Sequence, residues 1–380
     1  MYSLKSFGDM IADSARFNAY AEAISRCVRP GDVVVEIGCG PAVFALLACR
    51  AGARQVYAID TEDVVATARQ IAAANGYADR IQFLQSDSRN TELPERANVI
   101  VSDIRGVLPL FNGTVAAVRD AKQRLLAPGG VMIPRRDVLK AAVVAAKQFY
   151  SELTTPWSGS VNETELSIPL KMILNTPHGL RFKPEQLMSP AQTFCSLDYT
   201  GDPAVNAGAQ LTFSITRNAT AHGIGLWFET ELCDGMGFSS GPESPVTIYG
   251  QLFLPWLEPV PLREGQSISV DLRADLVGKD YLWRWETDIL PTDGERKIHF
   301  LQSSFEGANM STESLRRHAT DHIPVLTEEG EADRFLLQEM NGSATLEQIA
   351  AHAAAKFPKL YRRSEDAFQR AAELAQKFSR

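Results

Sequence analysis

Acidic residues and glycines near the amino terminus have the spacing of a ligand-binding turn. The stretch from Val33 to Gly40 reads VVVEIGCG, so three valines and Glu36 lead into two glycines, Gly38 and Gly40. This pattern predicts a buried strand followed by a tight turn into a helix. Asp60 ends the next apolar run, QVYAI, twenty residues after Gly40. Because an acidic residue at the tip of a second strand can hold the two hydroxyls of a ribose, these residues predict a nucleoside-containing ligand.

The turn itself indicates which class of nucleoside ligand is expected. It reads Gly38-Cys39-Gly40-Pro41-Ala42, and it lacks the third glycine that dinucleotide-binding turns favour beside a pyrophosphate. With Glu36 the form is E-x-G-x-G, which resembles motif I of class I S-adenosylmethionine-dependent methyltransferases. Because that cofactor carries no phosphate, the turn needs only a close backbone approach. The alternative is a strand, turn and helix with no ligand.

The composition excludes several other classes of protein. The chain has 380 residues, 45% hydrophobic and 22% charged, with a formal net charge of −8. Nucleic acid is not expected as a partner, because phosphate contacts need clustered basic residues. No apolar run approaches the ~20 residues of a membrane span, and the first ten residues lack the apolar core of a signal peptide. We therefore expect a cytoplasmic protein, and the scattered cysteines as buried thiols, without zinc-site spacing: Cys27, Cys39, Cys49, Cys195 and Cys233.

Apolar runs divide the chain into three parts. Residues 1 to about 30 are expected to form an amphipathic helix, and strands then alternate with helices as far as Pro134, which is typical of a doubly wound parallel sheet. Strand-like runs separated by turn residues follow and predict an antiparallel barrel or sandwich. From about residue 329 the pattern is helical, with Thr345 and Gln348 spaced as a capping box. The predicted fold class is thus α/β plus β, with a small C-terminal helical domain.

Longer stretches resemble one family of methyltransferases. DMIADSARFNAYAEAI, VVVEIGCGPAVFALLACRAGARQVYAID, VIVSDIRGVL, LAPGGVMIP, SSGP and TIYGQLF are similar to the protein arginine methyltransferase family. The resemblance implies a seven-stranded Rossmann-like cofactor domain over 1–136 and a β-barrel substrate domain over 137–328. It also implies a dimerisation arm at about 150–190 and a homodimer. The region 329–380 includes DRFLLQEMNGSATLEQIAAHAAAKFP, which is similar to the helices of PqqD-like domains; a helical cap on the barrel is the alternative.

The resemblance implies roles for residues of the cofactor site. Arg16 would bind the methionine carboxylate bidentately, and Asp60 would accept hydrogen bonds from the ribose hydroxyls. Gly38 and Gly40 would allow the loop to approach the cofactor, and Glu36 belongs to the same motif. For Arg16 the alternative is a surface ion pair with Asp13. Two further residues after the third strand would lie near the adenine: Asp87 and Ser88.

The substrate end departs from the family pattern. Asp103 and Asn112 occupy the positions of the two glutamates that bind the guanidinium in the family, and they are the candidate catalytic residues. The Thr-His-Trp loop of the family aligns with Thr247-Ile248-Tyr249, and its N-terminal histidine aligns with Phe7. Arg105 adds a positive charge beside Asp103, which disfavours a cationic acceptor. The expected substrate contacts are Met10, Arg105 and Tyr249.

These residues predict an S-adenosylmethionine-dependent N-methyltransferase that acts on a peptide or protein side chain. A histidine-like acceptor is expected in preference to arginine, because a neutral imidazole needs no second carboxylate. Asp103 would orient the acceptor or take its proton. The pocket could instead recover the missing charge from Glu229, Glu231 or Glu243. The alternatives are a small-molecule methyltransferase of natural-product biosynthesis and a catalytically silent cofactor-binding module. No metal site is expected, since His318 and His322 lack a glutamate between them.

Overall fold

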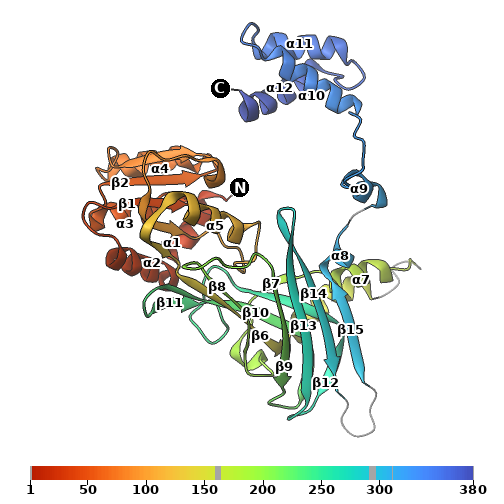
Figure 1. Ribbon diagram of the computed structural model, residues 1–380. Helices are drawn as coiled ribbons and strands as arrows, with labels where there is room; N and C mark the ends of the chain where they lie inside the picture. Colours follow the sequence, from red (N-terminus) through yellow and green to blue (C-terminus); the bar gives the residue numbers. More distant parts are fainter. Residues whose placement is uncertain (1, 159–163, 291–296, 310, 380) are drawn as a thin grey trace. The chain divides into compact units, whose positions relative to one another are not determined.

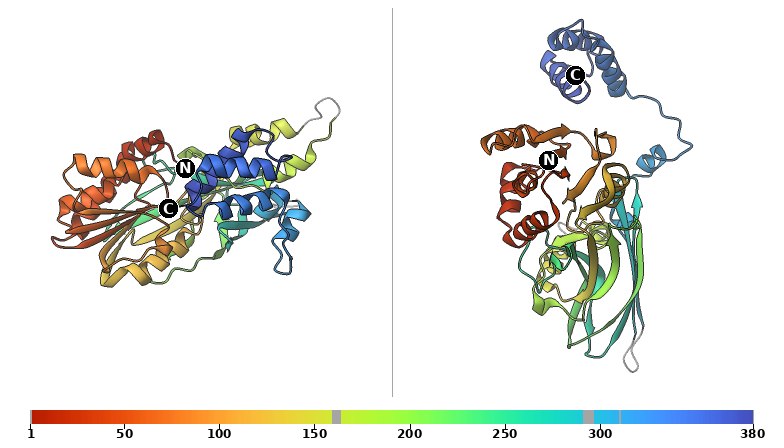
Figure 2. Two further views of the ribbon diagram at one scale, coloured as in Figure 1. Left: turned by 90° about the horizontal axis from the view of Figure 1, so that it is seen from above. Right: turned by 60° about the vertical axis from the view of Figure 1, so that its left-hand side comes forward.

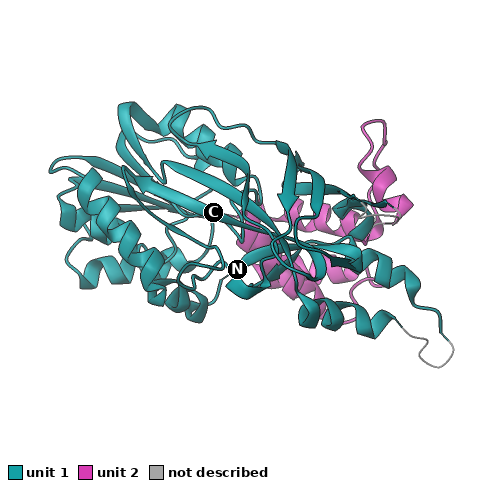
Figure 3. Ribbon diagram, turned by 90° about the horizontal axis from the view of Figure 1, so that it is seen from below, with its two compact units in different colours: residues 1–308 teal, residues 309–380 magenta. Residues whose placement is uncertain are grey.

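The computed structural model describes residues 2–158, 164–290, 297–309 and 311–379. The chain divides into two compact units, Met1–Ala308 and Asn309–Arg380 (Figure 3). In the described residues no helix is long and apolar enough to cross a bilayer. Nor do the same residues group three or more potential metal ligands together. All five cysteines are free thiols.

A parallel sheet forms the first part of the larger unit (Figure 1). Its strand order is β3-β2-β1-β4-β5, and the three central strands are almost fully buried because helices cover the sheet. The parallel Rossmann-like sheet is thus confirmed, although its described part has five strands where seven were expected, because after β5 the chain passes directly into the antiparallel part. The strands are β1 (Val33–Ile37), β2 (Gln55–Asp60), β3 (Ile81–Gln85), β4 (Ala97–Ser102) and β5 (Leu126–Ile133); the helices that follow β1, β2 and β4 are α3 (Val43–Ala51), α4 (Val64–Ala74) and α5 (Thr114–Leu125).

The amino-terminal segment forms two helices rather than the single one predicted. Helix α1 (Leu4–Ala12) ends at Asp13, and α2 (Ser14–Cys27) begins directly after it. The break occurs because the Asp13 carboxylate accepts a hydrogen bond from the backbone N–H of Arg16, as an N-cap residue does. Its other oxygen accepts from the backbone N–H of Ile248, at 2.7 Å. Asp13 therefore connects the start of α2 to the substrate part of the chain.

The antiparallel part consists of two sheets with a shared apolar core (Figures 1 and 2). One has the order β7-β12-β10-β6-β8, with β11 beside β10, and the other has the order β15-β14-β13-β9. The pairings among the described strands form two antiparallel sheets around one core, which agrees with the expected barrel or sandwich. The strands are β6 (Arg136–Val144), β7 (His178–Leu180), β8 (Gln192–Asp198), β9 (Ala207–Ser214), β10 (Ala219–Cys233), β11 (Met236–Ser239), β12 (Gln251–Leu262), β13 (Ser267–Val277), β14 (Asp280–Ile289) and β15 (Ile298–Ser303).

Two helices form an excursion between β6 and β7. They are α6 (Lys147–Thr154), with the 3₁₀ turn η2 (Thr155–Trp157), and α7 (Ser167–Leu174). The excursion is anchored by apolar residues, including Tyr150, Leu174 and Phe253. The segment expected to be the dimerisation arm, about 150–190, thus begins as a helical hairpin, while 159–163 lie outside the described residues.

Helices dominate the chain after β15. Helix α8 (Ser304–Gly307) closes the larger unit, and α9 (Thr312–Arg317) belongs to the smaller one. A core of alanine, leucine and aromatic residues joins α10 (Glu328–Glu339), α11 (Leu346–Lys356) and α12 (Ser364–Phe378). The capping box predicted at Thr345 and Gln348 is confirmed, because each side chain accepts a hydrogen bond from the backbone N–H of the other.

Candidate functional site

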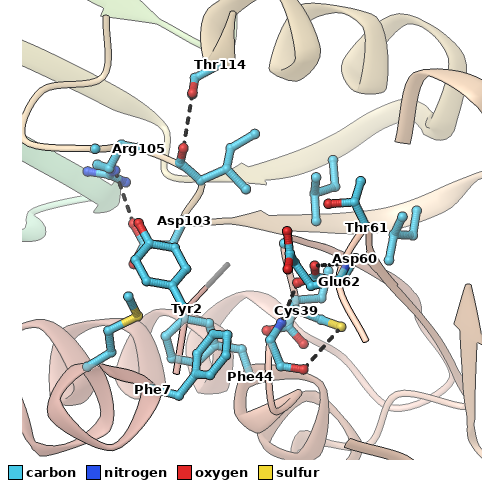
Figure 4. A pocket seen from close by; sticks show the side chains of 18 of the residues that line it. Tyr2, Phe7, Cys39, Phe44, Asp60, Thr61, Glu62, Asp103, Arg105 and Thr114 are labelled. Atoms are coloured by element: carbon cyan, nitrogen blue, oxygen red, sulfur yellow. Dashed lines mark hydrogen bonds and ion pairs between the residues drawn. The ribbon is translucent and has the colours of Figure 1, made fainter. Parts of the chain in front are cut away.

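A cavity of about 840 Å³ opens at the carboxyl ends of β1, β2 and β4. Ligands of open α/β sheets bind at this edge, because the loops that follow the strands meet there. Asp60, Thr61 and Glu62 lie on one side of the cavity, and Asp103 and Arg105 on the other (Figure 4). All twelve residues predicted as site residues line it: Met10, Arg16, Glu36, Gly38, Gly40, Asp60, Asp87, Ser88, Asp103, Arg105, Asn112 and Tyr249.

The turn after β1 requires its two glycines. Gly38 and Gly40 have φ angles of +71° and +50°, in the left-handed region that favours glycine. A Cβ atom at Gly38 would lie 2.3 Å from Cγ2 of Ile104, and one at Gly40 would lie 2.8 Å from Cε1 of Phe7. The backbone N–H of Gly40 donates to Oδ2 of Asp60 at 2.8 Å. The turn is therefore held at the cavity wall, and its two glycines carry no side chains that would cover its backbone.

Glu36 completes the amino terminus of α3. The residue before that helix is Ala42, whose methyl side chain cannot accept a hydrogen bond, so Oε2 of Glu36 accepts from the backbone N–H of Ala45 instead, at 2.8 Å. Burial raises the pKa of Glu36 to about 8, although the hydrogen bond from Ala45 opposes this shift. The side chain is therefore mostly protonated at neutral pH in the folded protein.

The Glu36→Gln variant is expected to be more stable than the wild type at neutral pH. Between the unfolded pKa of 4.5 and the folded value of about 8, only the unfolded chain loses the proton, so wild-type stability falls as pH rises, by about 1.4 kcal/mol per unit. Glutamine keeps an acceptor for Ala45 and does not titrate. Urea unfolding at about pH 5 and pH 8 should show the advantage of the variant growing with pH. An advantage that stays constant with pH would contradict the assignment.

Glu62 is a pocket residue that the sequence analysis missed. Both oxygens of Asp60 already accept backbone hydrogen bonds, one from Gly40 and one from Glu62. Oε2 of Glu62 is buried and has no hydrogen-bond partner among the described residues. A buried acceptor of this kind is costly unless a ligand satisfies it. The only signal in the sequence was a second acid two residues after the strand tip.

The loop after β3 is ordered by ion pairing. Asp87 accepts from Nη2 of Arg89 at 2.6 Å, and this interaction lowers the pKa of Asp87. Ser88 is buried, and its backbone carbonyl accepts from Nη2 of Arg124 at 2.7 Å. The two residues predicted near the adenine therefore lie on a fixed part of the wall.

The side chain of Arg16 contacts Asp103 rather than Asp13. Its Nε lies 2.5 Å from Oδ2 of Asp103, and its Nη1 donates to the backbone carbonyl of Met10 at 3.0 Å. The guanidinium also lies over the ring of Phe44 at 5.3 Å. The alternative of a surface ion pair with Asp13 is thus wrong, because the Asp13 carboxylate is used for capping.

Asp103 is the acceptor at the centre of a buried polar network. The Tyr249 hydroxyl donates to both of its oxygens, at 2.6 and 2.7 Å, and Arg16 and Arg105 approach it from either side. Burial raises the pKa of Asp103, but the charges of the two arginines and the hydrogen bond from Tyr249 outweigh that effect and lower it. Asp103 is therefore an ionised, fully occupied carboxylate and a weak base.

Arg105 lies deeper than a substrate contact would. Its side chain is 2% exposed, and each of its nitrogens has a partner. Nε lies 3.2 Å from Oδ1 of Asp103, Nη1 lies 3.0 Å from Oδ1 of Asp137, and Nη2 donates to the Tyr20 hydroxyl at 2.8 Å. Although Arg105 lines the cavity, its guanidinium is committed to the protein.

Asn112 has a structural reason to be asparagine. Its φ angle is +44°, and asparagine tolerates this region better than glutamate does. The side chain is exposed at the cavity wall, and it forms no hydrogen bond within the described parts of the chain. None of the three glutamates considered as replacements for the missing charge is among the described lining residues; Glu231 pairs with Arg136 at 2.8 Å, and Glu229 faces Lys140.

Comparisons with known proteins agree with this geometry. Residues 20–150 match the family model of ribosomal protein L11 methyltransferase, PrmA, and residues 136–279 match the arginine methyltransferase oligomerization subdomain. A probable protein arginine N-methyltransferase 6 of Arabidopsis thaliana is 24% identical over 306 residues, which cover 69% of this chain and 70% of the relative. Its counterpart 6.1 in Oryza sativa subsp. indica is 27% identical over 245 residues, 62% of either protein.

Solved structures share the fold of the chain. The Trypanosoma brucei PRMT1 enzyme–prozyme complex with AdoHcy has a TM-score of 0.72 at 20% identity, over 78% of this chain and 96% of that one. Arabidopsis thaliana protein arginine methyltransferase 10 has a TM-score of 0.70 at 20% identity, over 79% and 97%. The chain is a protein arginine methyltransferase-like enzyme. Its reaction is S-adenosylmethionine-dependent methyl transfer.

The cavity of this methyltransferase suits S-adenosylmethionine. Gly38 and Gly40 both line the cavity and carry no side chain that could project into it, and the unpartnered Oε2 of Glu62 provides an acceptor for a hydroxyl. Asp60 keeps free lone pairs beyond its two backbone hydrogen bonds. Nη2 of Arg16 has no hydrogen-bond partner among the described residues, so it remains available to a carboxylate. The chain spans 62% of the rice relative, less than two thirds of its length.

Proposed function

We propose that this methyltransferase methylates a neutral nitrogen on a peptide or protein side chain, with the imidazole of histidine preferred to the guanidinium of arginine. The observation that carries the proposal is the pairing of Asp103 with two arginine side chains, at 2.5 Å from Arg16 and 3.2 Å from Arg105. The relatives are named as arginine N-methyltransferases. We infer a peptide or protein substrate from those names, and we infer the preferred acceptor from the charges of the pocket.

The charges at the acceptor end of the cavity cancel. Arg16 and Arg105 are balanced by Asp103 and Asp137, and Asn112 is neutral. A guanidinium stays cationic at every working pH, so it would enter a pocket with no net negative charge to compensate its loss of hydration. An imidazole is largely neutral at pH 7, since its reference pKa is near 6.5. The pocket therefore favours the imidazole.

The same groups suit the chemistry of a neutral acceptor. When bound, S-adenosylmethionine supplies a methyl group activated by the sulfonium. An imidazole nitrogen attacks with a free lone pair, so no base is needed before attack, and the ring proton leaves to solvent after methylation. Asp103, with its lowered pKa, then serves to orient Tyr249 and Arg16 rather than to take a proton. The oxygen of the exposed Asn112 amide can accept a hydrogen bond from the N–H on the far side of the imidazole ring, which fixes the orientation of the ring.

Two matched peptides test the proposal. They differ only in one central residue, histidine or arginine, and are incubated with the full chain and methyl-labelled cofactor. Mass spectrometry locates the methyl group. We expect the histidine peptide to be labelled at least about tenfold faster, a difference that needs only about 1.4 kcal/mol in the transition state. Faster labelling of the arginine peptide would overturn the preference. Retained binding of S-adenosylhomocysteine without label in either peptide would favour a small-molecule acceptor or a silent module.

We also propose that the enzyme is a homodimer joined through the α6–α7 excursion. The matched oligomerization subdomain spans 136–279 and includes these helices. Ile168, on α7, is 69% exposed, so its apolar side chain is available to contact a partner subunit. Within this proposal, 1–136 bind the cofactor, 137–328 supply the substrate and dimer contacts, and 329–380 form a separate helical domain.

The Ile168→Glu variant is expected to be monomeric at micromolar concentration. A charge in a small apolar contact costs a few kcal/mol, which lowers the dimerisation constant by about a hundredfold. Val277→Glu is the matched control, because Val277 is 64% exposed and lies on β13 rather than on the α6–α7 excursion. Light scattering should show the control as dimeric as the wild type. A wild-type protein that is already monomeric would contradict the dimer.

A further inference from the structure

The buried Arg105 has no obvious role in cofactor binding. Arg105 lines the cavity, but its side chain is only 2% exposed; its guanidinium lies over the ring of Phe228 at 5.0 Å and pairs with Asp103. A buried arginine is costly to desolvate, so its charge must be compensated by specific partners. The partners that compensate this charge, and the effect of Arg105 on Asp103, determine the net charge that the cavity presents to an acceptor.

We infer that Arg105 is a positioning residue that sets the charge preference of the acceptor pocket. It does so by neutralising Asp103 while Asp137 holds it in place. The inference rests on the proposed function, because it explains how this methyltransferase would reject a cation. It extends that proposal by assigning the rejection to one side chain and to a contact between the two parts of the larger unit.

Contacts from two other elements fix the position of Arg105. Asp137, on β6, accepts from its Nη1 at 3.0 Å, and Tyr20, on α2, accepts from its Nη2 at 2.8 Å. The Tyr199 hydroxyl in turn donates to the second oxygen of Asp137 at 2.8 Å. The side chains of Arg105 and Asp137 are 2% and 1% exposed. Swinging Arg105 into the cavity would leave Asp137 buried without its counter-charge, so the arginine stays where it is.

This arrangement separates the two carboxylates by function. Asp103 faces the cavity and shares the charge of Arg105 at 3.2 Å. Asp137 provides the compensating charge, yet it is not among the described residues that line the cavity. The acceptor therefore meets a carboxylate that is already paired with Arg16 and Arg105, and the additional anion is hidden behind the wall. Removal of the Arg105–Asp137 pair as a unit would expose more of the charge of Asp103 to the acceptor.

The test removes both charges of the Arg105–Asp137 pair in the full chain. The variant is Arg105→Met/Asp137→Asn, and Arg105→Lys is the control that keeps the positive charge. The probes are the matched histidine and arginine peptides, with kcat/KM measured for each. We expect the arginine-to-histidine ratio to rise by about tenfold or more in the double variant, since rejection of a like charge is lost. In Arg105→Lys the ratio should stay within about threefold of the wild type.

A purely structural role would give a different pattern. It would lower both rates together and leave the ratio unchanged, and an unchanged ratio in a folded double variant would overturn the inference. A lysine variant that shifts the ratio as far as the double variant would also overturn it. If thermal unfolding shows that the double variant has no cooperative transition, Arg105→Gln/Asp137→Asn replaces it, because the two amides can hydrogen-bond to each other.

Binding separates failure of this inference from failure of the proposed function. Calorimetry with S-adenosylhomocysteine and the arginine peptide needs no methyl transfer. If the wild type labels neither peptide, the proposed histidine preference fails. In that case a gain of about tenfold in affinity for the arginine peptide in the double variant still supports the role of Arg105. No gain overturns it.

Discussion

The Asp103→Asn variant is expected to lose methyl transfer by at least about a hundredfold, in the range seen when a group that orients the reacting atoms is removed. Asparagine keeps the size of the side chain but not its charge, so Arg16 and Arg105 would face one another with no anion between them. The Tyr249 hydroxyl, which now donates to both oxygens of Asp103, would keep only one neutral acceptor oxygen. We expect the free energy of unfolding to fall by about 3 kcal/mol as well, since one partner of a buried ion pair is removed.

Asp137→Asn is the matched control for this experiment. It removes the same charge from the same network, and its side chain is also buried, but Asp137 itself is not among the described residues that line the cavity. We expect a similar loss of stability, yet less than about a tenfold loss of rate. Rates are compared at a temperature where both variants are folded, which circular dichroism checks. An equal loss of rate in the two variants would show that network stability, not the position of Asp103, supports turnover.

The Gly38→Ala variant is expected to weaken binding of S-adenosylhomocysteine by about a hundredfold. Alanine at a φ of +71° costs about 1–2 kcal/mol, and its methyl group would lie 2.3 Å from Cγ2 of Ile104. Ile104 cannot move aside easily, because it is β-branched and its neighbours Asp103 and Arg105 are both held by ion pairs. The turn itself must therefore shift away from Ile104, which changes the part of the cavity wall that we expect to contact the cofactor.

Gly76 provides a control with nearly the same backbone angle. Its φ is +74°, and a Cβ there would meet no atom of the described residues within 4 Å. Gly76→Ala should therefore lose a similar amount of stability to the left-handed conformation, about 1 kcal/mol, but keep affinity within about threefold. Calorimetry measures both. Equal loss of affinity in the two variants would mean that strain alone, and not the collision with Ile104, weakens binding.

The cofactor half of the site could be predicted because its determinants are local in the sequence. A glycine turn between a buried strand and a helix needs only neighbouring residues, and Asp60 follows from the end of the next strand. The carboxyl ends of adjacent parallel strands must meet, so Gly38, Asp60 and Asp103 were certain to share one edge once the strand pattern was known.

The acceptor half could not be predicted to the same depth. That Arg105 pairs with Asp137 depends on how β6 packs behind the cavity wall, and no periodicity in the sequence specifies this. The sequence likewise did not predict that α1 would end at Asp13, because the second hydrogen bond of this carboxylate comes from Ile248, 235 positions away. Glu62 was missed because its significance lies in the lack of a hydrogen-bond partner within the described structure, which only coordinates reveal.

The contact between Asp13 and Ile248 also governs when the enzyme can begin to work during its own synthesis. All strands of the parallel sheet have left the ribosome's active centre once Ile133 is added, but the acceptor end of the pocket still lacks Ile248 and Tyr249. At ordinary rates of translation these residues follow roughly ten seconds later. Until then Arg16 and Asp103 have each other but not the Tyr249 hydroxyl. A nascent chain therefore cannot modify a substrate before most of its second part has been made.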